Sequence, residues 1–557
     1  MAFYDTILGY LAAGQARLVT RKFFAACENA TRVQDALLQR FLQATRGSDF
    51  ARQFGLDRVR TYDDYVRAAP VQTYEQIRPY VDEVRAGRVE ALFTSGTPIL
   101  MFALTSGTTA QPKYIPVTKW VLDSSRQGWN IWGVKAILDH PGTMVRHIVQ
   151  VTSPMDDHFT PTGVPCGAIT GLLARNQKRL VRRYYTSPPS IAKIPNAEAK
   201  YYTIMRLAVP RDVAWLVTAN PATLLLLAKT ANEHRETLIR DIHDGALSAS
   251  MDVPDVVRAS IRSRLRKQPA IARRLEQLAR THGGLYPKHY WNLGFRAHWL
   301  GGSMGLYESQ FPEWYGDTPA RDIGLIASEG RMSIPVDDGS AAGVLAVRTQ
   351  FYEFIPEAEY GRDNPTTLRS HEVEPGAVYF IVLTNGSGLY RYDMGDRVRV
   401  TGWSGQAPKI EFLSRDAHSS SMAGEKLTED LVVQAMGTAS GDNAAIEMFV
   451  LAPRFEGTPH YRLYVDTADA DRRTDLAVRF EAALVASSVE YADKRKSLRL
   501  APVEVVRLSA GFLKKRDNRL RLDRARTAEQ FKHQYLLPRP NMDEDLAAAA
   551  IAFASAG

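Results

Sequence analysis

The chain has 557 residues, enough to bury a large core and to form more than one domain. A hydrophobic content of 45% with 24% charged residues is ordinary for a soluble globular protein, and no internal repeat or low-complexity tract occurs. The 70 basic and 61 acidic residues leave a net charge of +9, an excess that helps to attract anionic substrates. Two cysteines, Cys27 and Cys166, exclude a disulfide framework and indicate a reducing cytoplasm.

Helices and strands alternate along the first three quarters of the chain. Helical periodicity or capping predicts helices over residues 33–45, over 118–139 with Thr118 as the cap, and over 221–244, as one long helix or a pair. Strands are predicted at residues 99–104, 144–151, 343–354, 377–384 and 397–402. Mixed elements in this order indicate a large α/β domain.

A different pattern follows Asp416. A short polar segment, residues 415–423, precedes a predicted helix at 428–436, strands at 445–451 and 461–466, a helix at 473–487 and a strand at 503–508. This pattern is typical of a compact α+β unit. We therefore expect a large domain over residues 1–416, a small domain over 417–540, and a frayed or weakly helical tail over 541–557.

The basic excess is concentrated in residues 258–280, where basic residues alternate with Ile, Leu and Ala at helical spacing and Pro269 divides two helices. A nucleic-acid-binding arm is one interpretation. Solvated amphipathic helices are favoured, since the stretch has no aromatic residue for base stacking. The N-terminus lacks a targeting signal, and apolar runs such as 222–228 fall far short of the roughly twenty residues that cross a bilayer. We expect a cytoplasmic protein without nucleic-acid or membrane partners.

The most informative segment is residues 104–113, which read LTSGTTAQPK after a predicted strand. Glycine lets the backbone turn and present N–H groups, hydroxyl groups add donors that suit phosphate oxygens, and the lysine adds a positive charge. The residues of this predicted phosphate loop are Thr105, Ser106, Gly107, Thr108, Thr109 and Lys113. A polar hairpin is the alternative interpretation. A Walker loop is excluded, because no second glycine precedes the lysine.

Three further motifs follow in order: 322–330 (DIGLIASEG), 388–396 (GLYRYDMGD), and 412–416 (FLSRD) with 424–427 (GEKL). The phosphate loop and these motifs together resemble the adenylate-forming superfamily, which includes acyl-CoA synthetases, peptide-synthetase adenylation domains and luciferases. The wording ASEG, YRxxxGD and YEFIP (residues 352–356) is similar to the Gretchen Hagen family of acyl-acid amido synthetases, best known from plant auxin and jasmonate conjugation. The resemblance covers residues 36–539.

The resemblance implies a firefly luciferase-like architecture, with a large α/β N-terminal domain and a smaller, mobile α+β C-terminal domain. It implies that ATP and Mg²⁺ activate a small carboxylic acid as an acyl-adenylate. An amine, which we expect to be that of an amino acid, then converts the adenylate into an amide. An acyl-CoA ligase and a catalytically silent nucleotide-binding protein stay open as alternatives. The alternative of a catalytically silent protein rests on three departures from the family pattern, at Ala110, at Leu325 and after Lys532. The family often has a tyrosine that stacks on adenine at the position of Leu325.

The resemblance also assigns roles to residues outside the loop. Ser328 and Glu329 lie at the nucleotide, and Glu329 could hold Mg²⁺, which prefers carboxylate oxygens. Asp396 follows Gly395, so we expect it on a tight turn with a free carboxylate, where it binds the ribose hydroxyls. Arg415 resembles the arginine that reaches the nucleotide from the domain hinge.

The family's small domain delivers a lysine to the adenylation site, and two places compete for that role. Lys532 lies in QFK followed by PR, although five residues separate Lys532 from Pro538. Lys514 and Lys515 lie in what reads as a basic turn. We favour Lys532.

Other catalytic patterns are missing from the sequence. No GxSxG elbow occurs, and His289, His298 and His371 lack metal-ligand spacing. The glycines of residues 299–304 would allow the backbone to approach a ligand, or simply form a tight turn.

Overall fold

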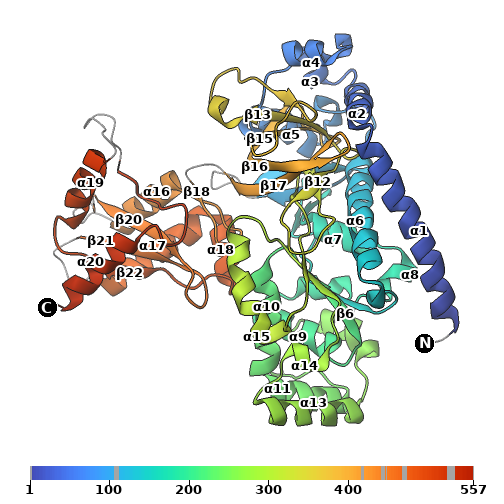
Figure 1. Ribbon diagram of the computed structural model, residues 1–557, viewed down its shortest axis with the longest axis vertical. Coiled ribbons are helices and arrows are strands. Elements are labelled where there is room, and N and C mark those ends of the chain that lie inside the picture. The colour runs from blue at the N-terminus through green and yellow to red at the C-terminus, as the bar shows by residue number, and fades with distance from the viewer. Residues whose placement is uncertain are drawn as a thin grey trace. The chain divides into compact units, whose positions relative to one another are not determined.

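The computed structural model describes residues 3–105, 112–415, 419–440, 446, 448–466, 473–523 and 533–555 (Figure 1). The chain divides into two compact units, of which the first contains Met1–Thr105 and Lys113–Ser414 and the second contains Arg415–Gly557. The predicted domain limits at 416 and 540 stay predictions.

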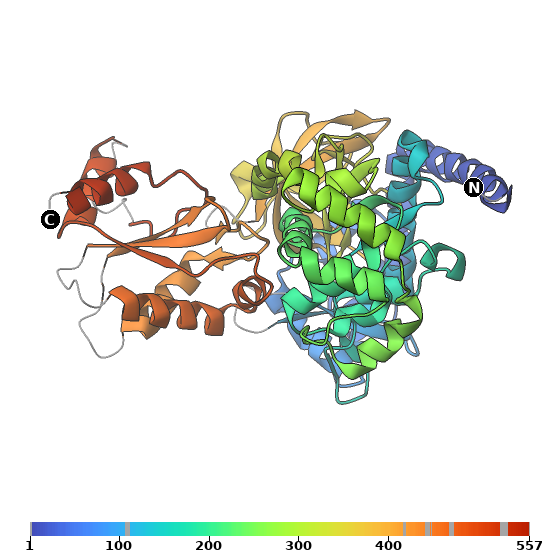
Figure 2. The same cartoon turned by 90° about the horizontal axis from the view of Figure 1, so that it is seen from below.

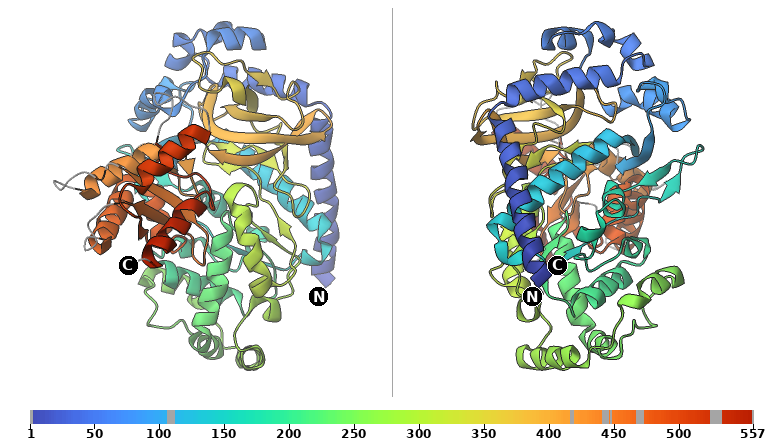
Figure 3. Two further views of the ribbon diagram at one scale, coloured as in Figure 1. Left: turned by 60° about the vertical axis from the view of Figure 1, so that its left-hand side comes forward. Right: turned by 90° about the vertical axis from the view of Figure 1, so that its right-hand side faces the viewer.

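The helices of the first unit are α1 (Phe3–Cys27), α2 (Ala30–Ala44), α3 (Asp49–Gln53), α4 (Tyr62–Ala68), α5 (Tyr74–Arg85), α6 (Lys119–Asp139), α7 (Ile169–Arg175), α8 (Arg179–Arg182), α9 (Ala197–Ala208), α10 (Pro221–Glu233), α11 (Arg235–Asp244), α12 (Asp255–Ile261), α13 (Pro269–His282), α14 (Pro287–Tyr290) and α15 (Phe311–Tyr315). Helix α1 runs beside α6 (Figure 3), and α9–α11 and α13–α15 gather in the part of the unit that contains β6 (Figure 1).

The strands of the first unit are β1 (Ile99–Thr105), β2 (Lys113–Thr118), β3 (His147–Gln150), β4 (His158–Phe159), β5 (Pro165–Gly167), β6 (Val213–Val217), β7 (Phe295–Ala297), β8 (Ala320–Arg321), β9 (Ile326–Ala327), β10 (Gly330–Arg331), β11 (Ser333–Ile334), β12 (Gly343–Leu345), β13 (Phe351–Pro356), β14 (Leu368–Arg369), β15 (Val378–Thr384), β16 (Tyr392–Ser404) and β17 (Ala407–Arg415).

Two sheets of four strands carry the α/β character of this unit. The sheet β3-β6-β7-β8 is parallel throughout, and helices connect its strands. In the sheet β2-β1-β5-β4, strand β1 is antiparallel to β2 and parallel to β5. The register places Thr105 opposite Lys113. The two ends of the predicted phosphate loop are therefore cross-strand neighbours.

A third sheet has the strand order β11-β12-β17-β16-β15-β13-β14. Its strand β16 bulges where it pairs with β15: Phe380 faces Arg397 and Val382 faces Asp393, so residues 394–396 stand opposite the single residue Ile381. Gly395 adopts a φ of 70°, which glycine accepts without strain. The prediction that Asp396 lies on a tight turn is wrong, because the residue lies inside this long, bulged strand.

Most predicted helices match the structure closely. Thr118 caps α6 by accepting a hydrogen bond from the backbone N–H of Val121. Residues 221–244 form the pair α10 and α11, and Pro269 opens α13 at its first position, where a missing N–H costs nothing. The prediction of one strand over 343–354 is wrong: β12 ends at Leu345 and β13 begins at Phe351.

The second unit contains β18 (Ser419–Ser420), β19 (Leu427–Thr428), α16 (Glu429–Ser440), β20 (Phe449–Arg454), β21 (His460–Val465), α17 (Arg473–Ser487), α18 (Val489–Lys496), β22 (Glu504–Arg507), α19 (Phe512–Asp523) and α20 (Glu544–Ser555). Strand β20 is antiparallel to β21, and β21 is parallel to β22. Lys514 and Lys515 lie on α19, so the prediction of a basic turn there is wrong.

Helices cover both faces of the β20–β21–β22 sheet (Figure 2). Phe449 and Leu451 pack in one core with residues of α16, α17 and α18, whereas Val450 and Ala452 pack in another with residues of α19 and α20. This alternation follows from the two-residue period of a strand. Among the described residues, no helix has the length and apolar content needed to cross a membrane.

Candidate active site

Three of the predicted motifs meet at the side chain of Tyr392. The Nζ of Lys113, at the start of β2, donates to the Tyr392 hydroxyl at 3.4 Å, and this hydroxyl donates to Oε1 of Glu329 at 3.5 Å. Tyr392 is fully buried and Glu329 is only 4% exposed. Sequence reasoning missed Tyr392 as a connecting residue, although it lies inside the motif that ends at Asp396.

The second carboxylate oxygen of Glu329 is buried and accepts no hydrogen bond from any residue that the structure describes. Such an oxygen carries much of the carboxylate charge without a donor to stabilise it. The arrangement favours a cation as its partner. Within the described ranges, no group of three or more His, Cys, Asp or Glu side chains could hold a metal ion. Any metal here would need further ligands from a substrate.

The turn that carries Glu329 is fixed from three sides. The Ser328 hydroxyl donates to the carbonyl oxygen of Leu104 at 3.2 Å, which ties this turn to the end of β1. Asn385 donates to the carbonyl oxygen of Glu329 at 2.8 Å. Gly330 has a φ of 148°, and a Cβ atom there would collide with the Gln350 side chain. Glu329 is therefore held in place beside the end of β1, which leads into the predicted phosphate loop.

The bulge in β16 brings two carboxylates towards Lys113. Burial raises the pKa of Asp393, and the nearby Asp396 carboxylate adds to the rise. Hydrogen bonds from the Gly395 N–H and the Tyr360 hydroxyl, and the charge of Lys113, act in the opposite direction. The Gly395 N–H donates to Asp393 Oδ1 at 2.8 Å. Asp396 is 1% exposed. Lys113, Glu329, Asp393 and Asp396 thus form one charged group, in which Glu329 and Asp396 are buried and Lys113 and Asp393 are half-buried.

Two other motif residues form the scaffold behind this group. Arg391, with a φ of 47°, pairs with Glu353 at 3.0 Å, and their side chains are 4% and 1% exposed. The guanidinium also donates to the carbonyl oxygen of Ala69 at 2.8 Å and to Thr367 Oγ1 at 2.7 Å. Tyr62 donates to Glu353 at 2.9 Å. This ion pair joins the YRxxxGD and YEFIP motifs, and its hydrogen-bonding groups are engaged within the fold rather than offered to a ligand.

The glycine turn at residues 299–302 is organised by Asp322. Its carboxylate accepts the N–H groups of Leu300, at 2.6 Å, and Gly324, at 2.5 Å. Burial raises the pKa of Asp322 to about 7. Trp299 donates through Nε1 to the carbonyl oxygen of Gly324 at 2.8 Å, so its indole is committed to the same turn. These hydrogen bonds explain the turn without a ligand.

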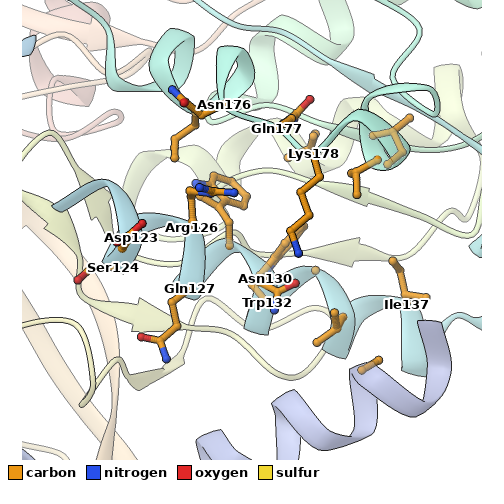
Figure 4. Close-up of a pocket in the computed structure, with 18 of the residues that line it drawn as sticks. Asp123, Ser124, Arg126, Gln127, Asn130, Trp132, Ile137, Asn176, Gln177 and Lys178 are labelled. Carbon is orange, nitrogen blue, oxygen red and sulfur yellow. The ribbon is translucent and has the colours of Figure 1, made fainter. Parts of the chain in front are cut away.

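A large cavity of about 1430 Å³ lies along α6 and is shown in Figure 4. Its wall is aromatic and aliphatic on α6, β3, β6 and α7, with Trp129, Trp132, Tyr185 and Trp215 among the lining residues. None of the nucleotide-motif residues whose side chains the structure describes lines it. Trp120 and Ser124 line both this cavity and a small pocket beside Glu329. The cavity is therefore a neighbour of the buried charged group, and distinct from it.

Several predicted site residues cannot be placed. Ser106, Gly107, Thr108, Thr109 and Lys532 lie outside the described residues, as does Ala110. The side chain of Arg415 is also outside the described part, although β17 ends at this residue. The described members, Thr105, Lys113, Ser328, Glu329 and Asp396, come from β1, β2, the β9–β10 turn and β16.

Comparison with protein-family models shows which family the chain belongs to. The GH3 family N-terminal domain matches residues 19–320, more than half of the chain. The chain belongs to the GH3 family. The GH3 central domain matches residues 343–415 and the GH3 C-terminal domain residues 430–541.

Curated relatives and solved structures agree with this assignment. A jasmonoyl–L-amino acid synthetase of Nicotiana attenuata is 25% identical over 414 residues, covering 71% of both chains. A 4-substituted benzoates–glutamate ligase of Arabidopsis thaliana is 25% identical and covers 80% of both chains. The structure of the GH3.15 acyl acid amido synthetase matches with a TM-score of 0.64 and 21% identity, covering 96% of this chain and 95% of that one. The predictions of family, fold class and enzyme class are confirmed.

Proposed function

We propose that this GH3 protein activates a carboxylic acid with MgATP as an acyl-adenylate and transfers the acyl group to the amino group of an amino acid. The observation that carries the proposal is the link from the half-buried Lys113 through the buried Tyr392 to the buried Glu329. The names of the GH3 relatives, which join acids to amino acids, support the same reaction. We place the reaction in the cytoplasm, in keeping with two free, buried cysteines.

The chemistry requires a carboxylate to attack the α-phosphorus while pyrophosphate leaves. Two anions must approach each other, so the site needs positive charge where negative charge develops. Lys113 would neutralise phosphate oxygens directly. The donors of residues 105–109 would hold the phosphates in line for attack. Asp396 would accept the ribose hydroxyls, and Arg415 would reach the nucleotide from the end of β17.

The residues present fit a magnesium ion. The buried oxygen of Glu329 that lacks a donor is a hard ligand of the type that Mg²⁺ prefers, and ATP phosphates would complete its coordination. The metal would supply charge neutralisation at those phosphates. Tyr392 would keep the Glu329 carboxylate and the Lys113 ammonium apart, so that neither quenches the other by direct pairing.

The cavity along α6 would hold the acid. It borders the charged group at Trp120 and Ser124, and its volume exceeds the roughly 300–1,000 Å³ of most small-ligand sites. The acid's carboxylate would leave this cavity towards the nucleotide. Water would be excluded by the aromatic wall, which protects an acyl-adenylate from hydrolysis.

A pyrophosphate-release assay tests the first half of the reaction. Purified protein with MgATP should release pyrophosphate only when a suitable acid is added, across a panel of aliphatic, aromatic and indolic acids. Mass spectrometry tests the second half. With an amino acid present, the product mass should equal acid plus amino acid less water, and coenzyme A in its place should give little thioester. A dominant thioester would replace the amide assignment with an acyl-CoA ligase, and no pyrophosphate with any acid would favour a silent nucleotide-binding protein.

The second unit would supply a lysine to adenylation and then move away for acyl transfer. We place this role on Lys532. The variant Lys532→Ala should slow adenylate formation and leave transfer from a supplied acyl-adenylate nearly unchanged. Lys515→Ala is the matched control, since this lysine lies on α19 of the same unit. If Lys515→Ala shows that pattern and Lys532→Ala does not, the placement is wrong.

A further inference from the structure

Seven basic side chains line the cavity along α6 and only one acidic side chain does. The basic residues are Arg40, Lys119, Arg126, Arg146, Lys178, Arg183 and Arg348, and the acidic one is Asp123. Asp123 is already paired with Lys119. A hydrophobic acid that is activated at its only carboxylate would leave most of this charge without a partner.

Several of these cations already have partners. Arg146 pairs with Asp212 at 2.6 Å, Arg40 lies over the Trp120 ring at 4.5 Å, and Arg183 donates to Tyr184. Arg126 and Lys178 differ. Among the residues that the structure describes, neither has a hydrogen-bond acceptor or an ion-pair partner. Arg126 is half-buried.

Figure 4 shows where these two side chains point. Arg126 projects from α6 into the space between α6 and the α7–α8 segment. Lys178 enters the same space from the α7–α8 side, and its Nζ points towards Asn130 on α6. Facing walls of the cavity therefore carry the half-buried Arg126, the exposed Lys178 and the amide of Asn130, and neither cation has a partner among the described residues. That is the chemistry of an anion site next to a flat apolar site.

The position of this anion site follows from the topology. Because β1 and β5 are parallel and pair at Ala103 and Gly167, both strands end on the same side, where the phosphate loop begins and α7 starts. Thr170, at the start of α7, lines the cavity near that end, and Lys178 follows the end of α7. The helix has 7 residues and rises about 10 Å over its length. Lys178 thus lies beyond the end of α7 that is remote from the end of β1.

We propose that the acyl substrate carries a second anionic group, separated from the reacting carboxylate by a flat, aromatic or extended body, and that Arg126 and Lys178 bind this group. The inference rests on the proposed function, because it takes the α6 cavity as the acid site. The charge does not belong to the nucleotide site, since none of Thr105, Lys113, Glu329 and Asp396 lines the cavity.

A matched pair of acids tests the proposal: 3-phenylpropanoic acid and 3-(4-carboxyphenyl)propanoic acid. Binding can be followed without ATP by tryptophan fluorescence, because four of the 8 tryptophans, at positions 120, 129, 132 and 215, line the cavity. Wild-type protein should bind the diacid about tenfold or more tightly than the monoacid, as expected for one charge-assisted contact. Lys178→Met and Arg126→Met should each reduce this preference several-fold. Lys119→Met, which removes a cation already paired with Asp123, should keep it.

Pyrophosphate release with the same acids and a MgATP titration complete the test. The kcat/KM preference for the diacid should fall in Lys178→Met, while MgATP binding should stay unchanged. Equal binding of the two acids by wild-type protein would overturn the inference, as would a Lys178→Met variant that loses MgATP affinity but keeps the diacid preference. Preferential binding of the diacid without pyrophosphate release from any acid would instead sink the proposed function and leave the anion site standing.

Discussion

Two sets of charged motif residues lie in the first unit, the Arg391–Glu353 pair and the group around Glu329. They differ in how many of their polar atoms have hydrogen-bond or ion-pair partners. Arg391 and Glu353 satisfy each other, Arg391 donates further hydrogen bonds to Ala69 and Thr367, and Glu353 accepts one from Tyr62. Among the described residues, one oxygen of Glu329 has no donor, and the other accepts a long hydrogen bond from Tyr392. A saturated buried pair maintains the fold, whereas an unsaturated one is available for chemistry. Identical treatment of the two groups by mutation should therefore give opposite phenotypes.

The largest effect should come from the saturated pair. Arg391→Met leaves the Glu353 carboxylate buried without its cation, which typically costs about 3–5 kcal/mol of stability. Urea or thermal unfolding should show this loss. The matched control is Arg397→Met on β16, the strand that follows Arg391, where the partner Glu357 is 47% exposed and the pair contributes about 0–1 kcal/mol. Equal stability of the two variants would contradict a scaffold role for Arg391.

The unsaturated group should show the reverse pattern. Glu329→Gln and Lys113→Met should each slow acid-dependent pyrophosphate release by about 3 kcal/mol in barrier height, on the order of a hundredfold. Unfolding midpoints should fall less than in Arg391→Met, since one Glu329 oxygen has no donor among the described residues and the hydrogen bond from Lys113 to Tyr392 is long. Lys22→Met, at an exposed lysine of α1 that lines neither the cavity nor the pocket beside Glu329, serves as the control. Wild-type rates in both site variants, with folding intact, would remove these residues from the reaction.

The difference between the two groups could not be read from the sequence. Motif order predicted the family, the α/β class and the candidates Lys113, Glu329 and Asp396, because local spacing and residue type carry that information. The pairing of Arg391 with Glu353 joins residues 38 positions apart, and only the register of the β-strands determines it. The same holds for Asp396, whose expected turn is a bulge set by pairing with β15.

Which side chains have hydrogen-bond or ion-pair partners is likewise determined by the tertiary structure. Tyr392 was one of several aromatic residues in the sequence, and nothing local distinguished it from Tyr390, which is also fully buried. The cavity along α6 draws its lining from segments between residues 16 and 348. Its unpaired cations, Arg126 and Lys178, are indistinguishable by sequence from the cations that have partners.

A buried titratable group, His298, tests how burial alone makes the stability of the fold depend on pH. Burial lowers the pKa of His298 to about 3, and the nearby Arg296 adds to this effect. The folded protein therefore keeps His298 neutral, whereas the unfolded chain takes up a proton below pH of about 6.5. Because the unfolded state binds more protons in this window, the stability contribution is complete above pH 6.5 and is lost as the pH falls towards 3.

At pH 5 this linkage should cost about 2 kcal/mol relative to pH 8, at about 1.4 kcal/mol per pH unit. His298→Gln removes the titration, so the stability difference between pH 8 and pH 5, measured by urea unfolding, should shrink by about that amount. The exposed His371 provides the control variant His371→Gln, which should leave the wild-type difference in place. An unchanged pH dependence in His298→Gln would show that His298 does not stay neutral in the folded protein.

The smallest effect should come from Tyr392→Phe, and it sharpens the comparison most. Its hydrogen bonds to Lys113 and Glu329, at 3.4 and 3.5 Å, are longer than the usual range, so each contributes little energy. Loss of the hydroxyl should slow pyrophosphate release by about 1 kcal/mol, on the order of fivefold. If the hydroxyl acts only by positioning the lysine, the double variant Tyr392→Phe/Lys113→Met should be no slower than Lys113→Met alone. Additive losses in this cycle would mean that Tyr392 acts independently of Lys113, and the link through its hydroxyl would then not be part of the mechanism.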